Sequence, residues 1–141
     1  MAFNVLIVDD SSSMRNIIKK IIQMSGFDVG HFLEASNGRE ALTILDNTWI
    51  DVIISDIHMP EMDGVAFLQA MQKKPTLSDT PVVIVTTEGR QDRIKGLLAL
   101  GAKACIRKPF KPEKLRDTLI DVLGIDRSGM EGAGGSQGCD F

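Results

Sequence analysis

Four short apolar segments of the chain each end in a polar residue, and this repeated pattern limits the possible folds more than any other feature. The segments and the polar residues that follow them are 5–8 with Asp9 and Asp10, 52–55 with Asp56, 82–85 with Thr86, and 104–107 with Lys108. In an open parallel sheet, ligands bind at the carboxyl ends of the strands. The pattern therefore predicts three carboxylates, a hydroxyl and an ammonium at one sheet edge, a site suited to a divalent cation and a phosphoryl group.

Segments with the apolar spacing of helices alternate with these runs. The expected strands are residues 5–8, 31–35, 51–55, 81–86 and 102–107, and the expected helical faces lie within 14–22, 41–45, 65–71, 94–98 and 115–122, with a turn at Asn37-Gly38. Such alternation indicates a parallel sheet with helices on both faces. The nearly continuous apolar character of three of the runs fits strands that are covered on both sides. We expect a doubly wound α/β sandwich of five β-α units.

Size and composition favour one globular domain. The chain has 141 residues, of which 43% are hydrophobic and 25% charged, and its net charge is -3. There is neither a basic run for nucleic acid nor an apolar stretch of the roughly 20 residues that a membrane span needs. The first residues lack a secretory signal pattern, and two cysteines do not make a disulfide framework. We expect a cytoplasmic protein that binds neither nucleic acid nor membrane.

The composition changes at Gly124. Glycines are interleaved with Ser, Gln and Asp from there to the last residue, so residues 124–141 cannot bury a core of their own. We expect a domain of residues 1–123 followed by a flexible Gly-rich tail. A native tail, the start of a linker to another domain and an addition from recombinant expression all fit this composition.

The motifs taken together resemble the receiver domain of two-component response regulators. They are Val-Asp-Asp-Ser at the first strand, Asp56 with Met-Pro-Glu-Met-Asp-Gly just after it, Thr86, and Lys108-Pro109-Phe110. The resemblance covers residues 4 to about 123, and single-domain chemotaxis regulators are the subtype that it favours. It implies a flavodoxin-like (βα)5 sandwich with a five-stranded parallel sheet of order 2-1-3-4-5.

The resemblance implies that Asp56 is the phosphoacceptor, and a carboxylate can indeed attack phosphorus to give an aspartyl phosphate. It also implies that Asp9, Asp10 and Asp56 bind Mg²⁺ together with the backbone carbonyl of His58, with Asp9 acting largely through water. Other roles for these residues stay open from the sequence. Asp56 could be a helix cap or turn former, and Asp10 or Ser11 could cap the first helix.

Thr86 and Lys108 face the phosphoryl group in the family, and the backbone amides of His58 and Thr87 are expected to supply further donors. The alternative for Lys108 is a solvated surface lysine. The Lys108-Pro109 bond is expected to be cis by resemblance alone. The side chains of His58 and Glu88 lie at positions that tune phosphate hydrolysis in the family. The alternative for His58 is a solvent-facing side chain without a role in hydrolysis.

One position departs from the family pattern. Chemotaxis-type relatives carry an aromatic residue three positions before the lysine, and Cys105 stands there in this chain. A thiol is small and buries readily, so an aromatic rotamer switch is not available at this position. We interpret Cys105 as a buried, inert residue at the switch position, with redox sensing as the alternative. Trp49 is expected to pack at a loop far from Asp56.

The implied function is that of a monomeric response regulator, not an enzyme in the ordinary sense, which catalyses its own phosphorylation and slow dephosphorylation. A sensor histidine kinase donates the phosphoryl group. The surface formed by the last strand and the last two helices, within residues 94–98, 102–107 and 115–122, then binds a downstream protein target, in the chemotaxis subtype a flagellar motor switch. The alternatives are a phosphate shuttle or sink in a phosphorelay, the N-terminal receiver of a longer regulator, a scaffold independent of phosphorylation, and a Mg²⁺-dependent phosphatase. The adjacent Asp9 and Asp10 differ from the Asp-x-Asp arrangement of such phosphatases.

Overall fold

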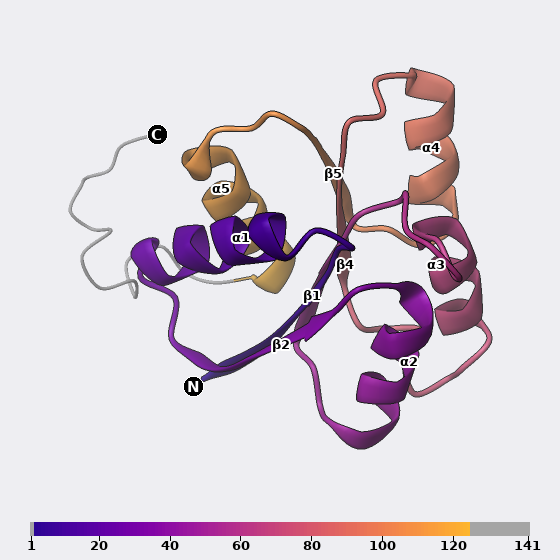
Figure 1. The fold of residues 1–141 in the computed structure, drawn as a ribbon, viewed down its shortest axis with the longest axis horizontal. Helices are drawn as coiled ribbons and strands as arrows, with labels where there is room; N and C mark the ends of the chain where they lie inside the picture. Colours follow the sequence, from indigo (N-terminus) through magenta and orange to yellow (C-terminus); the bar gives the residue numbers. More distant parts are fainter. Residues whose placement is uncertain (1, 125–141) are drawn as a thin grey trace.

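Helices and strands alternate strictly along the chain (Figure 1). The computed structural model describes residues 2–124. Its elements are β1 Phe3–Val8, α1 Ser12–Met24, β2 Val29–Ala35, α2 Gly38–Asn47, β3 Val52–Ser55, α3 Gly64–Gln72, β4 Val82–Thr86, α4 Gln91–Ala99, β5 Ala104–Arg107 and α5 Pro112–Leu123. The predicted tail, residues 124–141, lies outside the described residues apart from Gly124.

The strands form one parallel sheet of order β2-β1-β3-β4-β5, which confirms the predicted fold class. The register places Val8 beside Ser55 and Thr86 beside Arg107, so neighbouring strands end at the same edge. Strand β2 begins at Val29, two residues before the predicted start. The reason is a backbone pairing of Val29 with Phe3, at a register shift that the apolar pattern does not reveal.

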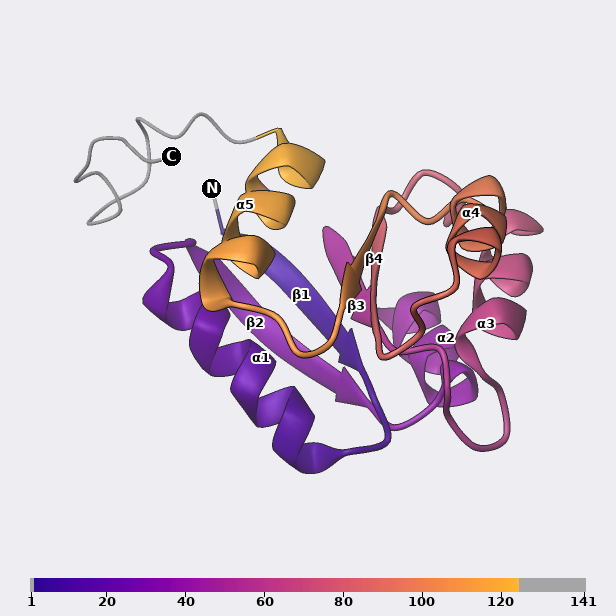
Figure 2. The same ribbon diagram turned by 90° about the horizontal axis from the view of Figure 1, so that it is seen from above.

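Helices cover both faces of the sheet. Helices α1 and α5 lie on one face and α2, α3 and α4 on the other (Figures 1 and 2). Alternate residues of β1 feed the two cores: Leu6 and Val8 join the core under α2–α4, and Val5 and Ile7 join the core under α1 and α5. The central strands β3 and β4 are buried along their whole length, as their continuous apolar sequences predicted.

Side chains at the helix starts explain several boundaries. Ser11, Asn37 and Asp63 each accept a hydrogen bond from a backbone N–H in the first turn of α1, α2 and α3. The predicted turn at Asn37-Gly38 is therefore wrong, because Asn37 is the N-cap of α2 and Gly38 its first residue. Helix α5 ends at Gly124, whose left-handed backbone (φ 68°) favours glycine.

Two apolar residues differ from their predicted environment. Leu98 was expected on the inward stripe of α4, but it is exposed and only Leu97 is buried in that helix. Trp49 lies in the loop before β3, as predicted, yet it packs little because it is 76% exposed. Its indole N–H donates to Asp51 Oδ1 over 3.0 Å, and this contact holds the ring at the surface. None of the helices within residues 2–124 combines the length and apolar character that crossing a bilayer requires.

Candidate functional site

Three carboxylates meet at the carboxyl edge of the sheet. Asp9 and Asp10 follow β1, Asp56 follows the neighbouring strand β3, and one oxygen of each lies within 4.8 Å of the others. The parallel register places these residues together, because Val8 pairs with Ser55 and the residues that follow, Asp9 and Asp56, therefore lie side by side at the ends of the two strands. The structure thus brings Asp56 next to an acidic pair that lies 46 and 47 positions earlier in the sequence.

Asp9 is the buried member of this acidic cluster, with 2% of its surface exposed. Its Oδ1 accepts the Ser11 N–H over 2.9 Å, and its Oδ2 accepts from Lys108 Nζ over 3.3 Å. Burial raises the pKa of Asp9 above its usual range, although the Ser11 hydrogen bond and the charge of Lys108 oppose the rise and the Asp56 charge adds to it. A cation placed here would relieve the cost of keeping this carboxylate ionised.

Asp56 has a different environment, because its two oxygens have separate partners. Oδ1 accepts the backbone N–H of Ile57 over 2.7 Å, and Oδ2 accepts from Lys108 Nζ over 3.4 Å. The alternative of a helix cap is wrong, because Asp63 caps α3. The alternative that Asp10 or Ser11 caps the first helix is confirmed for Ser11, whose side chain accepts the Met14 N–H, so the Asp10 carboxylate is not the cap of α1.

Lys108 connects the acidic cluster to β5. Its ammonium lies between the carboxylates of Asp9 and Asp56, and its side chain is 14% exposed, so it is not a solvated surface lysine. The Lys108-Pro109 peptide bond is cis, as the resemblance implied. Thr86 lies at the end of β4 and is buried, and its Oγ1 accepts the N–H of Glu88 over 3.1 Å.

The loop after Asp56 returns close to its own start, and Gly64 makes this possible. The Gly64 N–H donates to the Ile57 carbonyl over 2.8 Å. A Cβ at Gly64 would lie 2.5 Å from the Asp56 carbonyl oxygen, so only glycine fits without moving the backbone. His58 is exposed in this loop. Within residues 2–124 the backbone N–H groups of His58 and Thr87 form no hydrogen bond, so both remain available as donors.

Glu88 and Cys105 are not members of the acidic cluster. The Glu88 carboxylate accepts the N–H of Arg90 over 3.0 Å and lies 3.6 Å from Arg93 Nε, so it holds the start of α4. Cys105 pairs with Ile84 in the sheet and packs against the core under α2–α4, but it is half-buried and not fully buried as expected, because β5 is the edge strand of the sheet. Burial raises the pKa of the Cys105 thiol, which disfavours the reactive thiolate.

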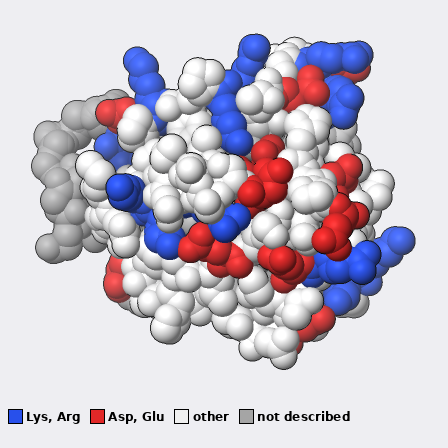
Figure 3. Space-filling view, viewed as in Figure 1, with Lys and Arg blue, Asp and Glu red and all other residues white. Residues whose placement is uncertain are grey.

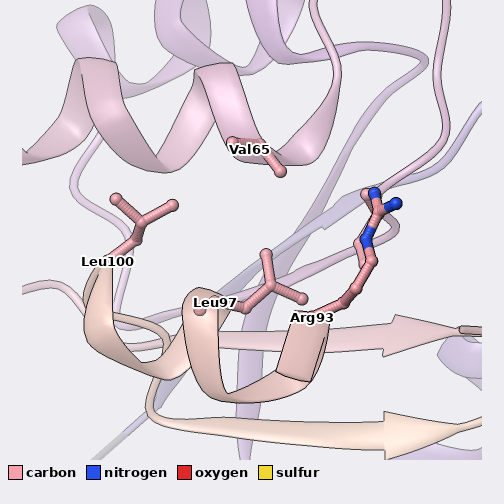
Figure 4. Close-up of a pocket in the computed structure, with 6 residues that line it drawn as sticks. Val65, Arg93, Leu97 and Leu100 are labelled. Carbon is pink, nitrogen blue, oxygen red and sulfur yellow. The ribbon is translucent and has the colours of Figure 1, made fainter. Parts of the chain in front are cut away.

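A half-open apolar pocket of about 180 Å³ lies between α3 and α4 (Figure 4). Val65 of α3 points across it toward Leu97 and Leu100 of α4, with Arg93 at one end. Ile57, whose N–H holds Asp56, also lines the pocket. The residue that directly follows the phosphoacceptor candidate Asp56 therefore lines the pocket between α3 and α4.

Charges of both signs are interspersed on the face that Figure 3 shows, without a continuous basic stripe. Near the acidic cluster, sequence reasoning missed Arg15, which donates to the Asp9 carbonyl. Its only sequence signal is a basic residue one helical turn after the N-cap of α1.

An all-oxygen donor set suits a hard divalent cation such as Mg²⁺ better than a softer metal. Asp9, Asp10 and Asp56 provide three carboxylates at short mutual distances, and one of them is buried where a cation would offset its cost. The residues present therefore fit a magnesium ion.

Comparison with known proteins gives a consistent result. The family model of the response regulator receiver domain matches residues 5–120. The "Chemotaxis protein CheY homolog" of Campylobacter jejuni is 40% identical over 121 residues, which cover 85% of this chain and 92% of that protein. The structure of the chemotaxis response regulator CheY4 of Vibrio cholerae superimposes with a TM-score of 0.78 at 37% identity, over 87% of this chain and 100% of that one. A chain of the CheX-CheY-BeF3-Mg+2 complex from Borrelia burgdorferi gives 0.77 at 32% identity, over 85% and 88%.

Proposed function

The chain belongs to the response regulator receiver domain family, and we propose that Asp56 is the phosphoacceptor of a chemotaxis-type regulator. Such a domain accepts a phosphoryl group and is not an enzyme in the ordinary sense. The observation that carries the proposal is the position of Lys108 Nζ between Asp9 Oδ2 (3.3 Å) and Asp56 Oδ2 (3.4 Å). A half-buried ammonium at this place is suited to the negative oxygens of an incoming phosphoryl group.

In the proposed reaction a phosphohistidine of a sensor kinase is the donor. An oxygen of Asp56 forms a bond to phosphorus while the phosphorus–nitrogen bond breaks and the imidazole of the kinase leaves. The Ile57 N–H holds Oδ1, so the oxygen that faces Lys108 is the nucleophile. The domain catalyses this step itself, because positioning and charge are most of what a protein contributes to phosphoryl transfer.

The residues that would hold Mg²⁺ are Asp9, Asp10, Asp56 and the backbone carbonyl of His58. When bound, the ion neutralises charge on the carboxylates and the phosphoryl oxygens. Lys108 donates to one phosphoryl oxygen, and the backbone N–H groups of His58 and Thr87 donate to others. Support for these assignments comes from the acidic cluster, the fit of its donors and the Mg²⁺ in the name of the Borrelia complex.

Phosphorylation would then change the bonding of Thr86. Its Oγ1 now accepts the Glu88 N–H, and the carboxylate of Glu88 holds Arg90 and Arg93 at the start of α4. A Thr86 hydroxyl drawn to the phosphoryl group leaves this N–H and alters the β4–α4 loop. The α4-β5-α5 surface responds through a two-state equilibrium, with Cys105 as a small residue where relatives carry an aromatic.

The partners that we propose are a chemotaxis histidine kinase and a downstream protein such as a flagellar motor switch. We propose that the chain acts as a monomer in the cytoplasm. Residues 1–123 act as the receiver unit. Transfer of radiolabelled phosphate from a purified, phosphorylated chemotaxis kinase to the wild-type chain, and not to Asp56→Asn, would support this function. Label that passes on from Asp56 to a histidine phosphotransfer domain would favour the phosphorelay shuttle instead.

The side chains of His58 and Glu88 are proposed to tune the lifetime of the phosphate. His58 is exposed two residues after Asp56, where it can govern water access, while Glu88 acts through the loop that it holds. Replacing His58 by Asn and timing the loss of phosphate tests this role. An unchanged lifetime contradicts it.

A further inference from the structure

Arg15 connects helix α1 to the backbone of the acidic cluster. Its Nη1 donates to the carbonyl oxygen of Asp9 over 2.5 Å, and its Nε donates to Glu34 Oε1 of β2 over 2.8 Å. The Arg15 side chain is 17% exposed, so most of it is held between these two partners. A guanidinium can make both contacts at once because its donors form a rigid planar fork.

The carbonyl that Arg15 holds belongs to the peptide bond between Asp9 and Asp10. On its other side Asp9 is fixed as well, because its N–H donates to the Ala35 carbonyl over 3.0 Å. Among the described residues, the Asp10 carboxylate accepts no hydrogen bond. The direction in which Asp10 projects is therefore set by the two peptide planes that flank it: this one, and the Asp10–Ser11 plane, whose N–H donates to Asp9 Oδ1 over 2.9 Å.

Glu34 fixes the guanidinium in turn. Its second oxygen accepts from Lys19 Nζ over 2.6 Å, so both oxygens are engaged by residues of α1. The hydrogen bonds from Lys19 and Arg15 lower the pKa of Glu34, which keeps the carboxylate ionised near neutral pH. Arg15 and Lys19 thus share one anion, but only Arg15 reaches the backbone of the acidic cluster.

We propose that Arg15 is a positioning residue for the magnesium site: it orients the Asp9–Asp10 peptide so that the two carboxylates converge on the same cation as Asp56. This inference rests on the proposed function, because it concerns the same site. Partners that orient metal ligands commonly change metal affinity by about 10–100-fold when they are removed. The effect of charge alone has the opposite sign, since loss of a nearby positive charge favours cation binding.

The test is the dissociation constant of Mg²⁺, measured by titration calorimetry on the unphosphorylated full chain. Arg15→Met is expected to weaken binding about tenfold, in line with the loss of an orienting partner. Lys19→Met is the matched control, because it removes the other cation from Glu34 without touching Asp9. Its Mg²⁺ affinity is expected to stay the same or to rise slightly. Arg15→Lys keeps the charge but not the fork, and it is expected to remain weak.

Glu34→Gln provides a second variant that leaves Arg15 in place and loosens its guanidinium, and a smaller loss of affinity is expected. Equal affinity in the wild type and Arg15→Met overturns the inference and leaves the proposed function standing. Full recovery in Arg15→Lys also overturns it, because charge without geometry then suffices. A wild type that binds no Mg²⁺ overturns the proposed function and the inference together.

Discussion

The ammonium of Lys108 lies 3.4 Å from Oδ2 of Asp56, although 52 positions separate the two residues in the chain. The same nitrogen lies 3.3 Å from Oδ2 of Asp9. Lys108 therefore offsets the repulsion between carboxylates that a divalent cation would otherwise have to relieve. Under the proposed function, Lys108 would therefore have two opposite effects, one on the metal and one on the phosphoryl group.

Lys108→Met should separate these two effects. We expect Mg²⁺ to bind at least as tightly, because a competing positive charge is gone. Phosphorylation by acetyl phosphate should slow by about 10²–10³-fold, the usual loss for one donor that stabilises developing charge. Calorimetry and intact-mass time courses measure the two quantities. Lys103→Met, at an exposed lysine just before β5, is the control. A normal phosphorylation rate in Lys108→Met would contradict the role assigned to this residue.

The stability of the metal-free protein should depend on pH through Asp9. Burial raises the pKa of its carboxyl from 3.8. The Ser11 hydrogen bond and the Lys108 charge lower this pKa, and the Asp56 charge raises it further. A raised folded-state pKa means that the folded chain binds the proton more tightly, so this group contributes stability at low pH and loses it as pH rises through that pKa. Asp9→Asn should therefore unfold at higher urea than the wild type at neutral pH in EDTA.

The same comparison at a pH below 3.8 should give a smaller difference, because both side chains are then neutral. Added Mg²⁺ should stabilise the wild type and have much less effect on Asp9→Asn. An Asn variant that is less stable than the wild type at neutral pH in EDTA would show that the Lys108 pair outweighs burial, contrary to this expectation.

Gly64 and Gly96 should respond in opposite directions to alanine. A Cβ at Gly64 would meet the Asp56 carbonyl oxygen at 2.5 Å, whereas a Cβ at Gly96 has no atom within 4 Å. Gly64→Ala should lower the free energy of unfolding by about 1–3 kcal/mol, as overpacking does, and slow phosphorylation by moving Asp56. Gly96→Ala should raise it by about 0.5–1 kcal/mol, because glycine disfavours helix α4. Urea unfolding measures both, and equal effects would contradict the assigned contacts.

Tryptophan emission should report poorly on the site. Trp49 is the one tryptophan of the chain and lies before β3, at the opposite end of that strand from Asp56. It is largely exposed and held by Asp51. Saturating Mg²⁺ should leave its emission nearly unchanged while calorimetry detects binding. A large emission change at the same concentration would mean that the metal site alters the far edge of the sheet.

The fold could be predicted from the sequence because four of the five strands are apolar runs that end in a polar residue, and segments with helical apolar spacing separate the strands. The meeting of Asp9, Asp10 and Asp56 follows from strand order alone, once that order is known from the family. Parallel strands with a common register deliver these residues to one edge. The cis Lys108-Pro109 bond could be expected only by resemblance.

Three features of the structure differed from the sequence-based prediction or were missed by it. Asn37-Gly38 has the composition of a turn, yet the Asn37 side chain accepts the Glu40 N–H and starts a helix. Arg15 contacts a backbone carbonyl, and a carbonyl carries no residue-specific signal. Glu88 lies at the expected rim position, but its carboxylate is engaged by α4. The Asn37 contact is local, and its Asn-x-x-Glu spacing was a signal that the sequence offered, whereas the Arg15 contact forms only when α1 packs beside the end of β1.

The most direct test of the central claim is the intact mass of the chain after incubation with acetyl phosphate, with and without Mg²⁺, for the wild type and Asp56→Asn. The account predicts a gain of one phosphoryl group in the wild type with Mg²⁺, and no gain without Mg²⁺ or in Asp56→Asn. A wild type that binds Mg²⁺ and yet gains no mass, or an Asp56→Asn variant that gains as much as the wild type, would contradict Asp56 as the phosphoacceptor.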